Sequence, residues 1–424
     1  MADLAIRGGR VLDPSQNLDR VCDLLLSGGR VAEIGDGLTS EREVDARGLL
    51  IVPGLIDLHA HLREPGLPTE ETVATGAAAA VAGGFTSVLA MPNTDPPLDS
   101  PAAVAHVYMQ AARARLANVF PVGCVTRSRR GEDLAEMRAM ADAGVVAFSD
   151  DGDWIASARV MKLALEYARP LELPILAHCE EPELCAGGVV NEGEVSARLG
   201  LPARPACAEE IAVDRDLRLA GAVGGRLHVC HVSTAGSVEL IRAAKRRGIA
   251  VTCEVTPHHL MLTDEALAGC DTLFKVNPPL RTADDCRALL EGLADGTIDA
   301  VATDHAPHAP EEKELDLTAA PSGMLGLETA LALVLDRLVD TGLLDLRTVV
   351  YRMTAGPATA AGLLPRGTLR VGAPADVTVI DPEHRWYVDP AGFRTPGVGS
   401  PFAGWELKGR AVLTVVGGDI KYQA

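Results

Sequence analysis

Four histidines and three aspartates stand at the ends of short apolar runs in this chain of 424 residues. They are His59, His61, Asp150, Asp151, His178, His231 and Asp304. Imidazole and carboxylate ligands without thiolate favour Zn2+, with Mn2+, Co2+ or Fe2+ as substitutes. Four imidazoles with two carboxylates are enough for two divalent ions, which lower the pKa of a shared water and polarise a carbonyl. The pattern therefore predicts a site that hydrolyses amides.

The spacing of these residues carries more weight than any one of them. His59 and His61 are two positions apart, so on a strand both imidazoles point to the same face. A lone histidine is more often structural than a ligand. An H-x-H pair followed by histidine, histidine and aspartate at later strand ends is hard to attribute to chance. A carboxylate in such a cluster can take a proton from an attacking water and deliver it to a departing amide nitrogen.

Eight short apolar runs rich in β-branched residues alternate with amphipathic helical stretches in the middle of the chain. They span residues 55–61, 85–91, 119–125, 145–149, 174–178, 227–231, 249–255 and 298–303. Eight such units over about 250 residues predict a (β/α)8 TIM barrel, in which the C-terminal strand ends converge on one mouth. A doubly wound open sheet is the alternative, but no G-x-G-x-x-G follows the first run.

The two ends of the chain differ from the middle, with short alternating strands broken by glycine and proline. Residues 1–52 and 365–424 are expected to pair into one small β-sandwich-like domain, because neither is long enough to be stable alone. Residues 53–364 are expected to form the barrel, with 309–323 as a mobile loop over its mouth.

Composition narrows the classes of partner. The chain has 58 acidic and 39 basic residues, a net charge of −19, and 47% apolar residues. This describes a globular protein that does not bind nucleic acid. Without an apolar run of membrane-spanning length, we expect a cytoplasmic protein with no membrane partner. The nine cysteines include no C-x-x-C pair, which favours reduced thiols. An acidic small molecule would need a local site containing arginine.

Nine sequence blocks together resemble the amidohydrolase superfamily and, within it, the type I dihydroorotases, over essentially the whole chain. The most specific is Pro53–Gly66, which contains the H-x-H pair. The others are Ala82–Thr86, Met91–Thr94, Ser149–Gly152, His178–Glu180, His231–Thr234, Glu254–Leu260, Lys275–Arg281 and Thr303–His308.

The resemblance implies a role for each ligand. His59 and His61 would bind one of two Zn2+ ions per subunit, His178 and His231 the other, and Asp304 would be both a ligand and the catalytic base. Many relatives bridge the ions with a carboxylated lysine after strand four. Here the nearest lysine is Lys162, eleven residues beyond Asp151. We therefore expect Asp151 to bridge and Asp150 to be a structural acid.

The implied reaction is the reversible closure of N-carbamoyl-L-aspartate to (S)-dihydroorotate and water, the third step of de novo pyrimidine synthesis, with a bridging hydroxide. In the family the substrate contacts correspond to His61, Arg63, Asn93, Asn277, His308, Ser322 and Gly323. Of these, Arg63, Asn93 and His308 would hold the free carboxylate. Relatives commonly carry an aromatic residue in place of Ser322, which leaves its contact with the ring open.

We expect Arg63 to share the strand face of His61 and to grip a carboxylate with its forked guanidinium. The competing interpretation is an ion pair with Glu64 or Asp57. His228, His258 and His259 are expected to be structural. Cys179 and Cys230 are expected to pack as thiols on the strand face opposite the metal histidines.

Two other functions stay open. A hydantoinase or allantoinase would use the same metals, but its substrates lack the free carboxylate. A metal-free scaffold subunit of aspartate carbamoyltransferase would not need the complete ligand set. The partner predictions are a homodimer and a complex with aspartate carbamoyltransferase.

Overall fold

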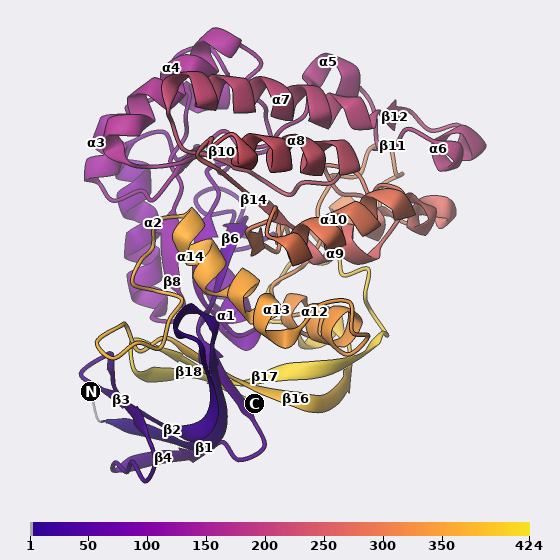
Figure 1. The fold of residues 1–424 in the computed structure, drawn as a ribbon. Coiled ribbons are helices and arrows are strands. Elements are labelled where there is room, and N and C mark those ends of the chain that lie inside the picture. The colour runs from indigo at the N-terminus through magenta and orange to yellow at the C-terminus, as the bar shows by residue number, and fades with distance from the viewer. Residues whose placement is uncertain (1–2) are drawn as a thin grey trace.

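The computed structural model describes residues 3–424, and a barrel of eight short parallel strands lies at its centre (Figure 1). The strands are β6 (Leu55–Ala60), β7 (Phe85–Ala90), β8 (Asn118–Pro121), β9 (Phe148–Ser149), β10 (Ile175–Ala177), β13 (Leu227–Val229), β14 (Val251–Val255) and β15 (Ala300–Val301). Each lies within or overlaps one of the eight predicted runs, so the predicted (β/α)8 barrel is confirmed.

The barrel closes through two short junctions. Strands β6–β8 form one arc and β9, β10, β13, β14 and β15 form the other. Single bridges join the arcs, between Gly123 and Phe148 on one side and between Ala60 and His305 on the other. The strands end earlier than the sequence predicts because the backbone turns at the mouth, with φ of 32° at His231 and 47° at Asp304.

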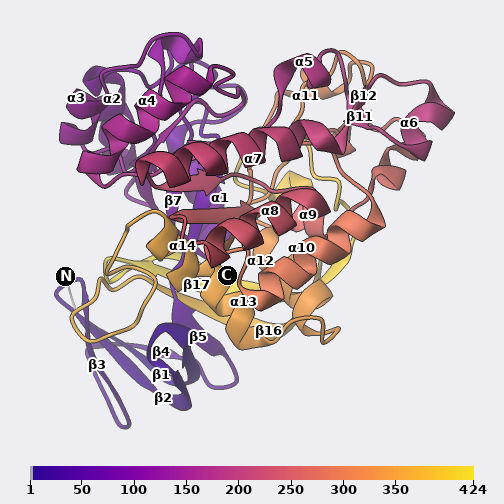
Figure 2. The same ribbon diagram turned by 45° about the horizontal axis from the view of Figure 1, so that its top comes forward.

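Helices follow the strands around the outside of the barrel. The longer ones are α1 (Val73–Ala82), α2 (Pro101–Ala114), α4 (Ala158–Ala168), α7 (Ala206–Val223), α8 (Ala235–Arg246), α10 (Ala283–Asp295) and α13 (Leu346–Met353). The shorter ones are α3 (Met137–Asp142), α5 (Pro182–Cys185), α6 (Glu194–Leu199), α9 (Pro257–Met261), α11 (Pro310–Lys313), α12 (Ala330–Val334) and α14 (Ala355–Ala360). Figure 2 shows α4, α7, α8 and α10 succeeding one another, each in contact with the next.

Local sequence fixes where these helices begin. Thr72 caps α1 by accepting a hydrogen bond from the amide of Thr75, and Thr282 caps α10 through Asp285 in the same way. Ser157 caps α4 through the amide of Val160.

Among residues 3–424, no helix is both long and apolar enough to cross a bilayer. All nine cysteines are free thiols, and seven of them are buried.

The terminal segments form one mixed sheet below the barrel in Figure 1. Its strands are β1 (Leu4–Asp13), β2 (Leu18–Ser27), β3 (Arg30–Gly35), β4 (Arg42–Asp45), β5 (Leu50–Pro53), β16 (Val377–Tyr387), β17 (Glu406–Val416) and β18 (Asp419–Gln423). The antiparallel pair of β5 with β16 joins the two ends of the chain. The division into units at residues 52 and 365 stays a prediction.

Two segments at the barrel mouth go beyond what the sequence predicts. Strands β11 (Val190–Asn191) and β12 (Ala203–Arg204) pair with each other outside the barrel, and α6 lies between them in the sequence. The predicted loop 309–323 is not irregular throughout, because it begins with the single turn of α11.

Candidate metal centre and substrate pocket

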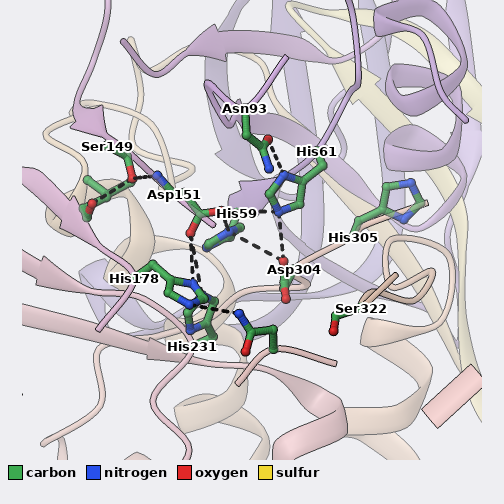
Figure 3. Close-up of polar contacts among 12 residues, drawn as sticks. His59, His61, Asn93, Ser149, Asp151, His178, His231, Asp304, His305 and Ser322 are labelled. Atoms are coloured by element: carbon green, nitrogen blue, oxygen red, sulfur yellow. Dashed lines mark hydrogen bonds and ion pairs between the residues drawn. The ribbon is translucent and has the colours of Figure 1, made fainter. Parts of the chain in front are cut away.

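Asp151 lies between two pairs of histidines at the C-terminal ends of the barrel strands (Figure 3). Its Oδ2 atom is 3.3 Å from Nε2 of His59 and 3.5 Å from Nε2 of His61. Its Oδ1 atom is 3.7 Å from Nδ1 of His178 and 3.6 Å from Nε2 of His231. One carboxylate thus faces both pairs, one oxygen to each, as a bridging ligand must.

Asp304 completes the first of these groups. Its Oδ1 atom is 3.1 Å from Nε2 of His61 and 3.6 Å from Nε2 of His59. Burial acts to raise the pKa of Asp304, but the hydrogen bond with His61 and the nearby imidazoles hold it below the usual range of a carboxyl group. Asp304 is therefore ionised at neutral pH and able to accept a proton.

The neighbouring Asp150 explains how Asp151 comes to face the mouth. The Asp150 carboxylate accepts hydrogen bonds from the amides of Val125 and Thr126, at 2.9 and 3.0 Å. The amide of Asp151 donates to Oγ of Ser149 at 3.0 Å. These contacts turn the two carboxylates in opposite directions, in the arrangement expected from the sequence.

The six residues fit a pair of divalent cations. Two ligands on one tetrahedral Zn2+ lie about 3.3 Å apart, since each is about 2.0–2.1 Å from the ion. The separations here are 3.0–3.7 Å, including 3.0 Å between Nδ1 of His178 and Nε2 of His231. Nε2 of His59 and Oδ1 of Asp151 are buried without a hydrogen-bond partner. Buried polar atoms are rarely left unpaired, so both atoms are suited to bind a cation.

The electrostatics favour positive charge at the same place. Burial opposes a charge on His59, but the Asp151 anion raises the pKa of His59 well above its usual value. Burial also opposes the Asp151 anion, yet His59, His178 and His231 lower the pKa of Asp151 well below its usual range. A divalent cation would supply the charge that both residues require.

Two glutamates for which the sequence predicts no role contact ring nitrogens of the candidate ligands His59 and His178. Oε1 of Glu254 is 2.9 Å from Nδ1 of His59, and its Oε2 is 3.2 Å from Nε2 of His228. Glu180 lies 3.2 Å from Nε2 of His178. Burial would raise the pKa of both acids, but their histidine partners lower each to about 2. Each carboxylate therefore accepts the ring N–H and leaves the other imidazole nitrogen free for a metal.

For Glu254→Gln we expect metal affinity at the His59–His61 group to fall about 10- to 100-fold, the usual effect of losing such a partner. Titration of the metal-free protein with Zn2+ against a chelator measures this. Glu180→Gln is the matched variant, since it should weaken the His178–His231 group instead. Unchanged affinity at both groups in Glu254→Gln would remove Glu254 from this role.

The pocket above the cluster is lined by all seven residues expected to contact substrate. They are His61, Arg63, Asn93, Asn277, His308, Ser322 and Gly323. Asn93 accepts a hydrogen bond from Nδ1 of His61 at 2.7 Å. The amide nitrogen of Asn277 is 3.2 Å from Nε2 of His178, and Arg204 donates to its oxygen. The structure thus brings the predicted contacts together, while their roles stay predictions.

Arg63 reaches the pocket by a different route from the one predicted. Strand β6 ends at Ala60, and Arg63 has a left-handed φ of 54°, so the expected shared strand face with His61 is wrong. Its Nε atom is 3.1 Å from Oε2 of Glu70 and donates to the carbonyl of Pro307 at 3.3 Å. The ion pair is therefore with Glu70, and neither Glu64 nor Asp57 takes that place.

His308 is held by the same region. Its Nε2 atom donates to the carbonyl of Ser322 at 2.8 Å. Burial and the charge of Arg63 lower the pKa of His308 to about 3, so its imidazole is neutral at neutral pH.

The remaining histidines and thiols pack as follows. His259 bonds to Thr256 at 2.8 Å and to the carbonyl of Pro278 at 3.0 Å. Cys179 lies against Asp216 on the side away from the cluster. The Cys230 thiol is packed in an apolar cluster with Leu58 and Leu176, as predicted. The predicted strand face is wrong, because the thiol lies in one group with His59 and Glu254. The strand is too short and irregular at its end for strict alternation of faces to hold.

Comparison with known proteins agrees with this geometry. A model of dihydro-orotase-like proteins matches residues 48–237, and one of the amidohydrolase family matches residues 200–422. The chain is 50% identical to a dihydroorotase of Citrifermentans bemidjiense over the full length of both chains. It is 51% identical to a dihydroorotase of Pelotomaculum thermopropionicum, covering 99% of this chain and 98% of that one.

Solved structures show the same fold. An L-hydantoinase of Arthrobacter aurescens superposes with a TM-score of 0.90 at 30% identity, covering 100% of this chain and 96% of that one. A D-hydantoinase of a Thermus species has a TM-score of 0.82 at 25% identity, covering 99% and 95%. From the ligand cluster, the family models and the full-length relatives, the chain belongs to the dihydroorotases of the amidohydrolase family, hydrolases that act on cyclic amides.

Proposed function

We propose that this protein catalyses the reversible closure of N-carbamoyl-L-aspartate to (S)-dihydroorotate and water, the third step of de novo pyrimidine synthesis, with two Zn2+ ions. The carrying observation is that Asp151 presents one oxygen to each of two histidine pairs directly beneath a pocket that contains Arg63. Full-length relatives that carry the name dihydroorotase support the same substrate.

The residues of the chain divide the chemistry between them. When bound, the two ions would polarise the amide carbonyl and lower the pKa of the attacking water. In ring opening, Asp304 accepts a proton from that water and delivers it to the ring nitrogen as the C–N bond breaks. In ring closure, Asp304 takes the proton from the ureido nitrogen and returns it to the hydroxyl that leaves the carboxyl group. Glu254 and Glu180 keep two of the ligand imidazoles in the required tautomer.

Arg63 selects for a free carboxylate. Glu70 and Pro307 use only its Nε atom, and no hydrogen bond within residues 3–424 uses its two terminal nitrogens. Those nitrogens can form the two parallel hydrogen bonds that a carboxylate accepts. Asn93 and the neutral His308 line the same pocket. A substrate anion is thus held by a local site in a molecule of charge −19.

A hydantoinase is the second candidate, favoured by the superposition with the L-hydantoinase of Arthrobacter aurescens. Turnover of N-carbamoyl-L-aspartate and dihydroorotate, set beside hydantoin and allantoin, separates the two. We expect the first pair to be preferred. Preference for hydantoin or allantoin would replace the proposed substrate.

The scaffold alternative is tested by metal analysis. All six ligand residues are present in one cluster, so the purified protein should bind about two equivalents of Zn2+. A chain that binds no metal would fit a scaffold subunit instead. The homodimer and the aspartate carbamoyltransferase complex stay predictions.

Arg63→Lys should raise KM for dihydroorotate about tenfold or more with little change in kcat, because lysine cannot supply the forked pair of donors. Steady-state kinetics in the ring-opening direction measure both constants. Arg129→Lys is the matched control, because Arg129 lies beside Gly152 at the pocket but is paired with Asp153 at 2.7 Å. A KM equal to that of the wild type in Arg63→Lys would contradict carboxylate binding by Arg63.

A further inference from the structure

Residues 320–323, here called the 320–323 wall, end in Ser322 and Gly323, which line the substrate pocket, and the backbone of each of the four residues is held by a hydrogen bond. The carbonyl of Ala320 accepts from Nζ of Lys275 at 2.5 Å, and that of Pro321 accepts from Nζ of Lys313 at 2.9 Å. The carbonyl of Ser322 accepts from His308, and the amide of Gly323 donates to the carbonyl of Lys275 at 2.9 Å. Four successive residues are therefore fixed by groups outside the wall.

The two lysines are unusual among the six of this chain. Lys162, Lys245, Lys408 and Lys421 each lie within 4.0 Å of a carboxylate. Within residues 3–424, Lys275 and Lys313 have no such partner, although both are more than nine-tenths buried. Their ammonium groups donate only to backbone carbonyls, and burial of such a charge is costly unless these bonds are made.

The bonds of each lysine join different parts of the pocket. Lys275 lies two residues before Asn277, which also lines the pocket, and donates to the carbonyl of Leu317 at 2.7 Å. Lys313 belongs to α11 and donates to the carbonyl of Thr272 at 3.2 Å, while Oγ1 of Thr272 donates to the carbonyl of Lys313 at 2.5 Å. The lysines thus fasten the 309–323 segment to the segment that carries Asn277.

Gly323 shows why this wall needs external ties. Its φ is 141°, and a Cβ there would come within 2.6 Å of the carbonyl oxygen of Ala306. The backbone approaches the pocket closely at a residue with no side chain to pack.

Lys313 is charged at neutral pH. Burial and the charge of Lys275 lower its pKa to about 8, so the ammonium form that donates to the carbonyl of Pro321 predominates.

We infer that Lys275 and Lys313 are positioning residues that hold the 320–323 wall against the ring of the bound substrate. They touch no reacting atom and act through the backbone of the wall. The inference rests on the proposed function for the identity of the ring. It adds that substrate binding depends on two charges that lie outside both the metal cluster and the carboxylate site.

The test compares Lys313→Met and Lys275→Met with Lys245→Met, in which a half-buried lysine on α8 loses its bond to Asp299. We expect both pocket variants to keep their Zn2+ and to raise KM for dihydroorotate about tenfold or more, with kcat within about threefold. Hydrogen exchange in the 309–323 segment should accelerate in these two variants and not in Lys245→Met. A wild-type KM in both pocket variants overturns the inference.

A measurement on the wild-type protein covers the case in which the variants do not fold. Under an amine-reactive reagent, Lys275 and Lys313 should be labelled slowest of the six lysines and more slowly still with dihydroorotate present. Labelling as fast as that of the exposed Lys162 overturns the inference. If the wild type does not turn over dihydroorotate, the proposed function fails instead, whereas slow labelling without ligand would still show the ties.

Discussion

Asp304→Asn should lose about a thousandfold or more of its turnover in both directions while keeping most of its metal. Asparagine preserves the shape of the side chain and one oxygen that can face His59 and His61, but it cannot take up a proton. In the native protein the pKa of Asp304 is held low, so the proton-accepting form is present across the neutral range. The loss should therefore appear in kcat and persist at every pH near neutrality.

The measurements are steady-state kinetics together with the zinc content of the purified variant. Asp299→Asn is a suitable control, because Asp299 lies just before β15, at the opposite end of the same strand, and pairs with Lys245. That variant should lose stability but retain the metal site. Near-normal turnover in Asp304→Asn would remove Asp304 from the role of base, and loss of its zinc would mean that ligation is its main role.

Asp151→Asn should weaken metal binding at both histidine pairs at once and reduce activity at least about a thousandfold, since the two proposed ions would contribute several kcal/mol to the reaction. The native carboxylate offers one oxygen to each pair, at 3.3–3.7 Å from the four imidazoles. An amide offers only one oxygen and carries no charge. Removing Asp151 also leaves the imidazoles without the anion that raises the pKa of His59.

Zinc titration and metal analysis after dialysis test this expectation. Asp153→Asn changes a carboxylate two residues away that is largely exposed and paired with Arg129, so it should keep both metals and full activity. Loss of one equivalent of zinc, with the other bound as tightly as in the wild type, would show that Asp151 belongs to one ion only.

The barrel and its ligand cluster could be predicted because both follow from short stretches of sequence. Apolar runs of fixed spacing define the strands, and the parallel topology carries their ends to one mouth whatever the loops do. The conformation of Arg63 could not be predicted in this way. Its left-handed backbone appears only when the chain after β6 turns toward Glu70 and Pro307.

Contacts between distant parts of the chain explain the other gaps. Glu254 is an acid inside an apolar strand, a signal that could have been noticed, but its pairing with His59 depends on closure of the barrel, which leaves only β15 between β14 and β6. Lys275 and Lys313 show no periodic pattern, and their partners are carbonyls of the 317–321 segment and of Thr272. Because every residue has a backbone carbonyl, the sequence does not indicate which carbonyls these lysines contact.

The pairing of β5 with β16 has a consequence for how the metal centre is assembled. Val52 lies opposite Thr378, and β5 leads within one residue into β6, the strand that carries His59. Contacts between such distant positions form late, because the intervening chain must first be ordered. During synthesis, β6 can pair early with β7, but β5, which leads into β6, lacks its partner β16 until the ribosome has released almost the whole chain. Completion of the polypeptide therefore sets the earliest moment at which the segment leading into the first metal ligands is paired on both of its edges.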